Sequence, residues 1–279
     1  MINNELPSTS KTRHNINPAT TEPNAEVPVS TQEDVDNAVS AARKACKGWS
    51  RVPVEKRREA LVAFADAIAS YKDDFARLLT MEQGKALSQS QQEVDLAVMW
   101  LKAIPEMKLP EEILEDTEDR QIIQRYTPLG VACGIVPWNY PVLLACGKIA
   151  PALYTGNSII IKPSPFTPYC DLKLGELGRQ FFPPGVLQVL SGGDDLGPML
   201  TAHPGIDKVS FTGSSVTGKK VMESCSKTLK RVTLELGGND ACIICEDVDI
   251  KKVIPKVRLP LCPVTTNQNR TDAIAFRIL

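Results

Sequence analysis

Two polar side chains in this sequence occupy positions that would suit acyl chemistry. Asn139, in the segment PWNYP, follows a predicted buried strand and precedes a helical pattern, so we expect it at the carboxyl edge of a sheet. Its amide could stabilise a developing oxyanion, or it could simply cap the following helix. Glu235 ends an apolar strand in LELGG. A desolvated carboxylate there would make a general base for water, whereas a structural salt bridge is the alternative.

Two further segments carry groups that suit a ligand with phosphate and ribose. Lys162 ends the predicted strand SIIIK, where its ammonium could reach such a ligand, although most lysines at strand ends are solvated. In FTGSSVTGKK, 211–220, a strand leads through glycine into a helix, and such a turn presents amides and a helix dipole to an anion or merely connects the two elements. Lys220 stands where a P-loop needs Ser or Thr, which excludes mononucleotide hydrolysis. The sequence contains no G-x-G-x-x-G fingerprint.

A C-x-x-C pattern at Cys242 and Cys245 raises the question of zinc or redox chemistry. On the predicted strand ACIICE, residues three apart point to opposite faces, so the two thiols cannot converge on one metal. We expect both in the core. The two histidines, His14 and His203, lie in polar turns and suggest no metal ligand set. The sequence therefore predicts no metal site.

The elements that would position these groups follow a regular alternation. Helices are expected over 32–46 after a Thr31 cap, over 54–79 up to Gly84, and over 87–104 with Glu93 outside the apolar face. Short β-rich runs then alternate with helices, giving strands 131–137, 158–162, 186–191, 208–212 and 231–236 and helices 140–153, 169–182, 196–202 and 216–226. This alternation predicts an α/β fold with a parallel sheet covered on both faces. The acidic segment 110–128 could form an exposed hairpin or a solvated loop.

Composition excludes several classes of partner. With 32 basic and 33 acidic residues among 279, the formal net charge is -1, so no general field attracts nucleic acid or an anionic membrane. The apolar runs are too short and too interrupted to span a bilayer. Eight cysteines without a recognisable signal peptide point to reduced thiols, and hence to a cytoplasmic protein.

Six motifs together resemble the aldehyde dehydrogenase superfamily. They are NPAT at 17–20, EQGK at 82–85, PWNYP at 137–141, IKPS at 161–164, FTGS at 211–214 and LELGG at 234–238. Their order matches the family, and the resemblance covers residues 16–256. It implies a doubly wound, Rossmann-like parallel sheet and oxidation of a small aldehyde to a carboxylic acid with reduction of NAD or NADP.

The resemblance also implies roles for individual residues. Asn139 matches the family's oxyanion donor, Glu235 the base that activates water for deacylation, and Lys162 the lysine that bonds the adenosine ribose. Further positions match those that line the cofactor: Val136, Pro137, Trp138, Ser164, Pro165, Gly193, Gly197, Phe211, Thr212, Gly213, Ser214, Thr217, Leu236 and Gly237.

Two departures from the family pattern bear on cofactor and catalysis. Many NAD-preferring members carry a glutamate three residues after the ribose-binding lysine, where this sequence has Pro165, so NADP is also plausible. The family's nucleophilic cysteine lies in a G-Q-x-C motif beyond the glutamate, and this sequence has none: Gln268 is followed by Asn269. Cys262 is the only cysteine downstream of Cys245, and nothing in its neighbourhood would activate its thiol.

The resemblance divides the chain into four parts. These are an N-terminal helical part of the dinucleotide-binding domain over 1–109, an oligomerisation hairpin over 110–128, the dinucleotide-binding domain proper over 129–240, and the start of a catalytic domain over 241–279 with an aberrant tail from about 257. We expect a truncated, inactive aldehyde dehydrogenase that forms a homo-oligomer or pairs with a full-length homologue. The alternative is a noncatalytic dinucleotide-binding or assembly module.

Overall fold

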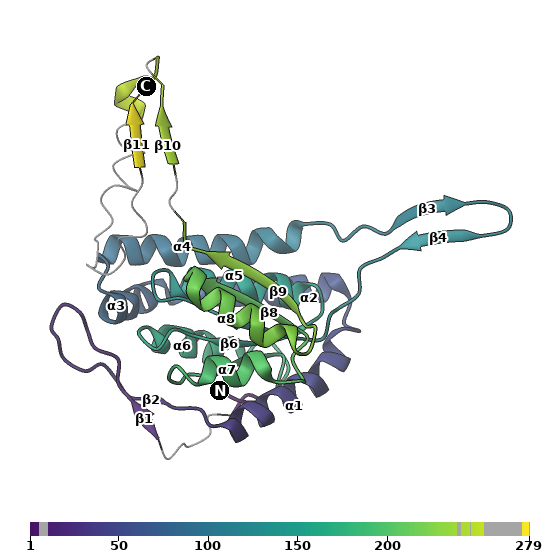
Figure 1. Ribbon diagram of the computed structural model, residues 1–279, viewed down its shortest axis with the longest axis horizontal. Helices are drawn as coiled ribbons and strands as arrows, with labels where there is room; N and C mark the ends of the chain where they lie inside the picture. The colour runs from purple at the N-terminus through teal and green to yellow at the C-terminus, as the bar shows by residue number, and fades with distance from the viewer. Residues whose placement is uncertain (6–10, 239–240, 246, 254–274, 279) are drawn as a thin grey trace.

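A five-stranded parallel sheet forms the centre of the protein. The computed structural model describes residues 1–5, 11–238, 241–245, 247–253 and 275–278. The strand order is β7-β6-β5-β8-β9, so the chain winds outward from β5 to β7 and then returns to the other side of β5. The predicted α/β fold with a parallel sheet is confirmed (Figure 1). The strands are β5 (Val131–Ile135), β6 (Ser158–Lys162), β7 (Leu187–Val189), β8 (Lys208–Gly213) and β9 (Arg231–Leu236).

Helices cover both faces of this sheet, and each face has its own hydrophobic core. Alternate residues of β5 point to opposite sides: Cys133 belongs to one core and Ala132 to the other. The core around Cys133 is built with α1 (Gln32–Trp49), α7 (Leu196–Ala202) and α8 (Ser215–Ser226). The other core is built with α2 (Val54–Ser70), α3 (Lys72–Gln83), α4 (Leu87–Ala103), α5 (Pro141–Tyr154) and α6 (Pro168–Gly178).

The N-terminal helices follow the predicted order, with one break. Thr31 caps α1 in a capping box with Asp34, as the sequence predicts. The single helix expected over 54–79 is wrong, because the chain leaves helical geometry at Tyr71, which ends α2 and begins α3. Gly84 ends α3 in the left-handed conformation, with φ 87°, which glycine adopts without strain.

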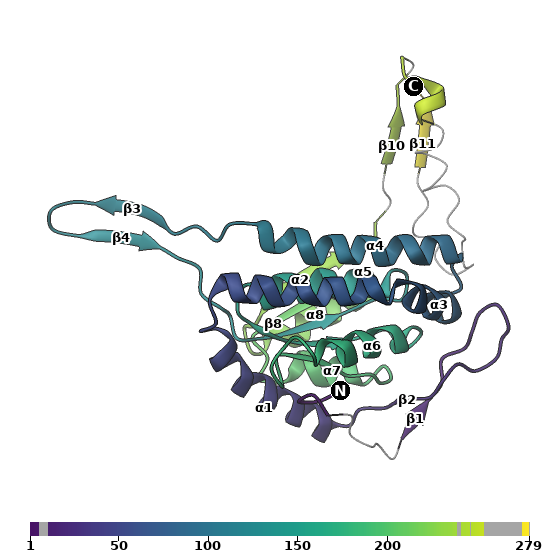
Figure 2. The ribbon, with the colours of Figure 1, turned by 180° about the vertical axis from the view of Figure 1, so that it is seen from behind.

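A hairpin extends far from the body of the protein. Strands β3 (Glu112–Asp116) and β4 (Gln121–Gln124) pair antiparallel after a short 3-10 turn, η1 (Ile104–Glu106). Figures 1 and 2 show that no other helix or strand of the described residues lies beside it. The hairpin, rather than the solvated loop, is therefore the form that segment 110–128 takes. It exposes the apolar side chains of Ile113, Leu114, Ile122, Ile123 and Tyr126.

Two small sheets complete the described chain. β1 (Thr12–Arg13) pairs antiparallel with β2 (Val27–Pro28), and β10 (Ala241–Ile244) pairs parallel with β11 (Ala275–Ile278). The β1–β2 segment is tied to the end of β7, since the Ser30 amide donates to the Ser191 carbonyl at 2.9 Å. Among the helices that the structure describes, none combines the length and apolarity needed to cross a bilayer.

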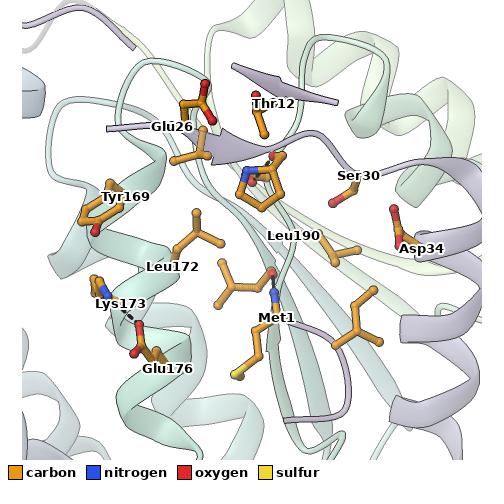
Figure 3. A pocket seen from close by; sticks show the side chains of 15 residues that line it. Met1, Thr12, Glu26, Ser30, Asp34, Tyr169, Leu172, Lys173, Glu176 and Leu190 are labelled. Carbon is orange, nitrogen blue, oxygen red and sulfur yellow. Dashed lines mark hydrogen bonds and ion pairs between the residues drawn. The ribbon is translucent and has the colours of Figure 1, made fainter. Parts of the chain in front are cut away.

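A cavity of about 430 Å³ lies between the N-terminal segment, α6 and the end of β7 (Figure 3). Its apolar wall includes Leu172 and Leu190, and its polar lining includes Glu26, Asp34 and the ion pair between Lys173 and Glu176. None of the residues predicted to contact a cofactor lines this cavity. We therefore place the candidate site elsewhere, at the carboxyl edge of the sheet.

Candidate functional site

The predicted site residues gather where the parallel strands end. The register pairs Ile135 of β5 with Lys162 of β6 on one side and with Phe211 of β8 on the other. On β9, Glu235 lies opposite Thr212. Because carboxyl ends of parallel strands meet at one edge, the segments that follow them also converge there. These segments contain Val136 to Asn139, Lys162 to Pro165, Gly193, Gly197, Gly213, Ser214, Thr217, Leu236 and Gly237.

The loop that carries Asn139 is held by a buried ion pair from the N-terminal helices. Lys85, just after α3, pairs with Glu93 of α4, and both side chains are buried. The Lys85 ammonium also donates to the Asn139 carbonyl at 2.7 Å and lies 4.0 Å from the centre of the Tyr140 ring. Lys85 therefore holds the backbone of the loop at Asn139, the candidate oxyanion donor.

Glu93 caps the helix that follows the loop. One of its carboxylate oxygens accepts from the amides of Val142 at 3.0 Å and Leu143 at 3.3 Å, in the first turn of α5. The expectation that Glu93 lies on the polar side of its helix is wrong, since it is 0% exposed. The cap reading of Asn139 is wrong as well: within the described chain its side chain makes no hydrogen bond, and it is exposed. The amide is thus free for a ligand.

A second buried glutamate performs the same task on the neighbouring helix. Glu82 of α3 accepts from the amides of Tyr169 at 2.7 Å and Cys170 at 2.9 Å, at the start of α6. Burial raises the pKa of Glu82 to about 7, although both backbone hydrogen bonds act in the opposite direction. Glu82 lies in the motif EQGK, and no role for it followed from the sequence. A sequence signal for these caps did exist. α5 and α6 each begin at a proline and have no capping side chain of their own, so their first amides need an acceptor from elsewhere in the chain.

The lysine that ends β6 is buried instead of solvated, so the solvated alternative is wrong. Lys162 is 6% exposed, and its ammonium donates to the Pro163 carbonyl at 3.2 Å. Burial lowers the pKa of Lys162, and the charge of Arg13 also lowers it, while Asp194 and Asp195 act to raise it. Ser164 is buried beside it and accepts from the Phe166 amide at 3.2 Å.

The turn between β8 and α8 presents a helix N-terminus to the same edge. Ser214 caps α8, accepting from the Thr217 amide at 3.2 Å. The Gly237 amide donates to the Gly213 carbonyl at 3.3 Å, which holds the end of β9 beside this turn. A methyl group added at Gly237 or Gly197 would meet no atom of the described residues within 4 Å, apart from the adjoining residues of the chain, so space for a ligand is open beside both glycines.

Glu235 is exposed in this chain, which contradicts the expectation of a desolvated carboxylate. The salt-bridge alternative also fails, since no ion pair of Glu235 occurs among the described residues. Sequence reasoning missed a neighbour, Lys148 of α5. Its buried ammonium donates to Ser210 at 3.1 Å and Thr212 at 2.8 Å. Burial lowers the pKa of Lys148 to about 8, and the negative charge of Glu235 acts in the opposite direction.

The cysteines of the described chain are mostly unsuited to nucleophilic chemistry. Burial raises the pKa of the Cys133 thiol to about 12 and raises those of Cys146, Cys170 and Cys225. Cys245 is exposed, so the expectation that it lies in the core is wrong. The side chain of Cys242 and the whole of Cys262 lie outside the described residues. No cluster of three metal-ligating side chains occurs within the part described.

Comparison with known sequences identifies relatives along most of the chain. The model of the aldehyde dehydrogenase family matches residues 6–259. A putative aldehyde dehydrogenase of Gibberella fujikuroi is 46% identical over 257 residues, which cover 92% of this chain and 56% of the relative. The chloroplastic betaine aldehyde dehydrogenase of Amaranthus hypochondriacus is 40% identical, with 85% of this chain and 50% of that protein covered. The chain thus spans about half the length of these curated relatives.

Solved structures share the fold. The aldehyde dehydrogenase of Brucella melitensis superposes with a TM-score of 0.92 at 30% identity, covering 98% of this chain and 58% of that one. The betaine aldehyde dehydrogenase of Staphylococcus aureus, solved in complex with NAD+, gives a TM-score of 0.88 at 33% identity. That match covers 93% of this chain and 53% of the structure.

Proposed function

The chain belongs to the aldehyde dehydrogenase family, and from this premise we propose that it forms the dinucleotide-binding part of an NAD(P)-dependent aldehyde dehydrogenase. One observation carries the proposal: the ends of all five parallel strands bring the candidate oxyanion donor, base and cofactor residues to the same edge. When bound, NAD or NADP supplies the acceptor for the hydride that leaves the aldehyde carbon. The domain boundaries expected from the sequence, and a cytoplasmic location, remain predictions.

The residues at this edge suit the cofactor's chemistry. The α8 N-terminus, capped only by the neutral hydroxyl of Ser214, favours the pyrophosphate by its dipole and free amides. The Lys162 ammonium has three N–H donors, and within the described chain it uses one, on Pro163. Its remaining donors can meet ribose hydroxyls. Open space at Gly197 and Gly237 lets the ligand approach the backbone closely.

Two residues would act on the substrate. Asn139, exposed and without a side-chain partner in the described chain, would donate from its amide to the aldehyde oxygen, which becomes an oxyanion when the carbon is attacked. Glu235, exposed at the end of β9, would remove a proton from water in deacylation. The oxyanion forms only when a thiolate attacks the aldehyde carbon, so the reaction requires a nucleophilic cysteine before either step, and the 279-residue sequence has no G-Q-x-C motif. We therefore propose that this chain binds the cofactor without oxidising aldehydes on its own.

Cofactor binding is tested by titrating the chain with NADH and NADPH and following ligand fluorescence. The informative variant is Gly237→Ala, because its methyl group meets no other atom of the described residues but would occupy space that the proposed cofactor site needs. We expect at least about tenfold weaker binding, equivalent to ~1.4 kcal/mol. Gly48→Ala is the matched control, since Gly48 is equally unobstructed but lies on α1. Absence of binding by the wild-type chain would refute the proposal.

Turnover is tested by mixing the purified chain with short and aromatic aldehydes and NAD or NADP, and measuring absorbance of the reduced cofactor. We expect no activity above the uncatalysed rate. A turnover number within the usual ~1–10³ s⁻¹ range would contradict the inactive state. In that case Cys245→Ser and Cys262→Ala decide whether one of these thiols serves as nucleophile.

A second candidate function, an assembly module, is favoured by the hairpin. The β3–β4 hairpin extends from the body with exposed Ile113 and Ile123 facing each other in register (Figure 1). Apolar side chains on a projecting hairpin suit pairing with a second copy of the chain or with a full-length homologue. Sedimentation velocity of the wild type and of Ile123→Lys tests this. A wild type that stays monomeric at every accessible concentration, alone and with the homologue, would rule it out.

A further inference from the structure

An arginine from the N-terminal strand reaches the same edge of the sheet, although no role for it followed from the sequence. Arg13 lies in β1, and its guanidinium donates to the carbonyl of Gly192 at 3.1 Å. Within the described chain this is the one hydrogen bond of its side chain, so most of its five donors remain available. The side chain is only half-buried, which leaves it reachable for a ligand.

The register of the sheet brings this guanidinium near Lys162. β6 and β7 pair Ile161 with Val189, and the Leu190 amide donates to the Ile161 carbonyl at 2.9 Å. Lys162 therefore lies beside Leu190, two residues before Gly192, on strands about 4.8 Å apart. The two charges act on each other, since Arg13 contributes to lowering the pKa of Lys162. Arg13 and Lys162, neither of which has an ion-pair partner in the described chain, thus lie near each other at the carboxyl ends of β6 and β7.

The surrounding groups favour an anion with several oxygens. Ser164, two residues after Lys162, is buried and keeps its hydroxyl proton for donation while its oxygen accepts from Phe166. Pro165 contributes no carboxylate. Asp194 and Asp195 are the acidic residues whose charges act on Lys162. Both are exposed, so water and salt screen them more strongly than the buried lysine.

We propose that Arg13, on the N-terminal strand, is a specificity-determining residue that binds the 2′-phosphate of NADP beside the expected cofactor positions Lys162 and Ser164. The inference rests on the proposed binding of a dinucleotide at this edge. A nearby arginine is the usual means by which Rossmann-type sheets accommodate that phosphate. Guanidinium nitrogens bond phosphate oxygens in a fork, and a phosphate monoester near neutral pH carries more than one negative charge. NAD, which has a ribose hydroxyl there, gains little from Arg13.

The experiment compares four ligands on the complete 279-residue chain: NADPH, NADH, 2′-AMP and 5′-AMP. The variant is Arg13→Gln, because its amide can still donate to the Gly192 carbonyl while the charge is removed. We expect it to weaken NADPH and 2′-AMP at least about tenfold, the size of one charge-assisted hydrogen bond. Affinity for NADH and 5′-AMP should change less than twofold. Arg13→Lys should restore part of the loss, and Arg51→Ala, which removes an exposed charge elsewhere, should change nothing.

The outcomes separate this inference from the proposed function. Equal weakening of NADPH and NADH by Arg13→Gln, or weakening of neither, would overturn the role of Arg13 while cofactor binding itself stands. A wild-type chain that binds NADH but not NADPH would do the same. If the wild type binds none of the four ligands, both proposals fail. Far-UV circular dichroism of each variant confirms that the fold is retained.

Discussion

Replacing Lys85 with methionine should destabilise the protein strongly and in a pH-dependent way. Lys85→Met removes the counter-charge of Glu93, which is 0% exposed, along with the bond to the Asn139 carbonyl and the contact with Tyr140. Methionine is close to lysine in length, so the packing volume is largely kept. The perturbation is therefore mainly the loss of a buried charge.

The size of the destabilisation follows from the Glu93 carboxyl group, which stays buried without its partner. Breaking a buried ion pair by removing one partner costs about 3–5 kcal/mol, a large part of the ~5–15 kcal/mol by which domains are stable. Burial raises the pKa of Glu93 even with Lys85 present. Without Lys85 that pKa should rise further, so at low pH a proton replaces the lysine and the cost becomes small. A carboxyl whose pKa is raised in the folded state contributes less to the stability of the protein as pH rises, so the cost of Lys85→Met should be larger at high pH than at low pH.

Urea denaturation at about pH 5.5 and pH 8, followed by tryptophan fluorescence, measures this effect. Lys72→Met is the matched control, because Lys72 pairs with Asp95 across α3 and α4 on the surface and should cost less than about 1 kcal/mol. In the double variant Lys85→Met/Glu93→Gln, the glutamine can still accept from α5, and most of the lost stability should return. A Lys85→Met variant no less stable than Lys72→Met, or a cost independent of pH, would refute the reasoning.

Three further predictions concern the supports of the site. Because the pKa of Glu82 is raised to about 7, its contribution to the unfolding free energy is full below about pH 4.5 and declines by about 3 kcal/mol as pH rises through 7. In urea denaturation at several pH values, the stability of Glu82→Gln should therefore depend less on pH than that of the wild type. Gly147→Ala should destabilise by about 1–3 kcal/mol, since its methyl group would lie 2.4 Å from the Trp100 ring, and altered tryptophan emission should accompany the lower melting temperature. Thr31→Ala should cost about 1 kcal/mol in a thermal melt by removing the cap of α1, and no change would mean that Asp34 alone suffices.

The order and type of the elements could be predicted because each depends on local pattern. The β-rich runs alternate with amphipathic helices, and the observed strands at Ser158–Lys162 and Arg231–Leu236 have the predicted bounds. Position at the carboxyl edge follows from the same pattern, because in a parallel sheet every loop after a strand lies at one edge. The candidate cofactor residues could therefore be named from sequence, together with the family motifs.

Burial of polar side chains could not be predicted in the same way. Glu93 and Lys162 read as surface residues because charged side chains are usually exposed, and only the fold shows which amide or carbonyl each one meets. The prediction for Glu235 was wrong in the opposite direction. Its apolar strand indicated a desolvated carboxylate, but β9 is the edge strand of the sheet and leaves the carboxylate exposed. Contacts between residues distant in sequence, such as Arg13 with Gly192, have no local signature.

The two capping glutamates also give a reason why an anion should bind at α8 and not at α5 or α6, the helices on the opposite face of the sheet. α5, α6 and α8 all begin at the carboxyl edge, and each helix N-terminus attracts negative charge. Glu93 already accepts from the first amides of α5, and Glu82 accepts from those of α6, both from buried positions. α8 has only the neutral hydroxyl of Ser214. Its dipole and amides therefore remain available to a pyrophosphate. Because the N-terminal helices occupy the amides at the start of α5 and α6, the proposed function leads us to expect the cofactor at the turn that follows β8.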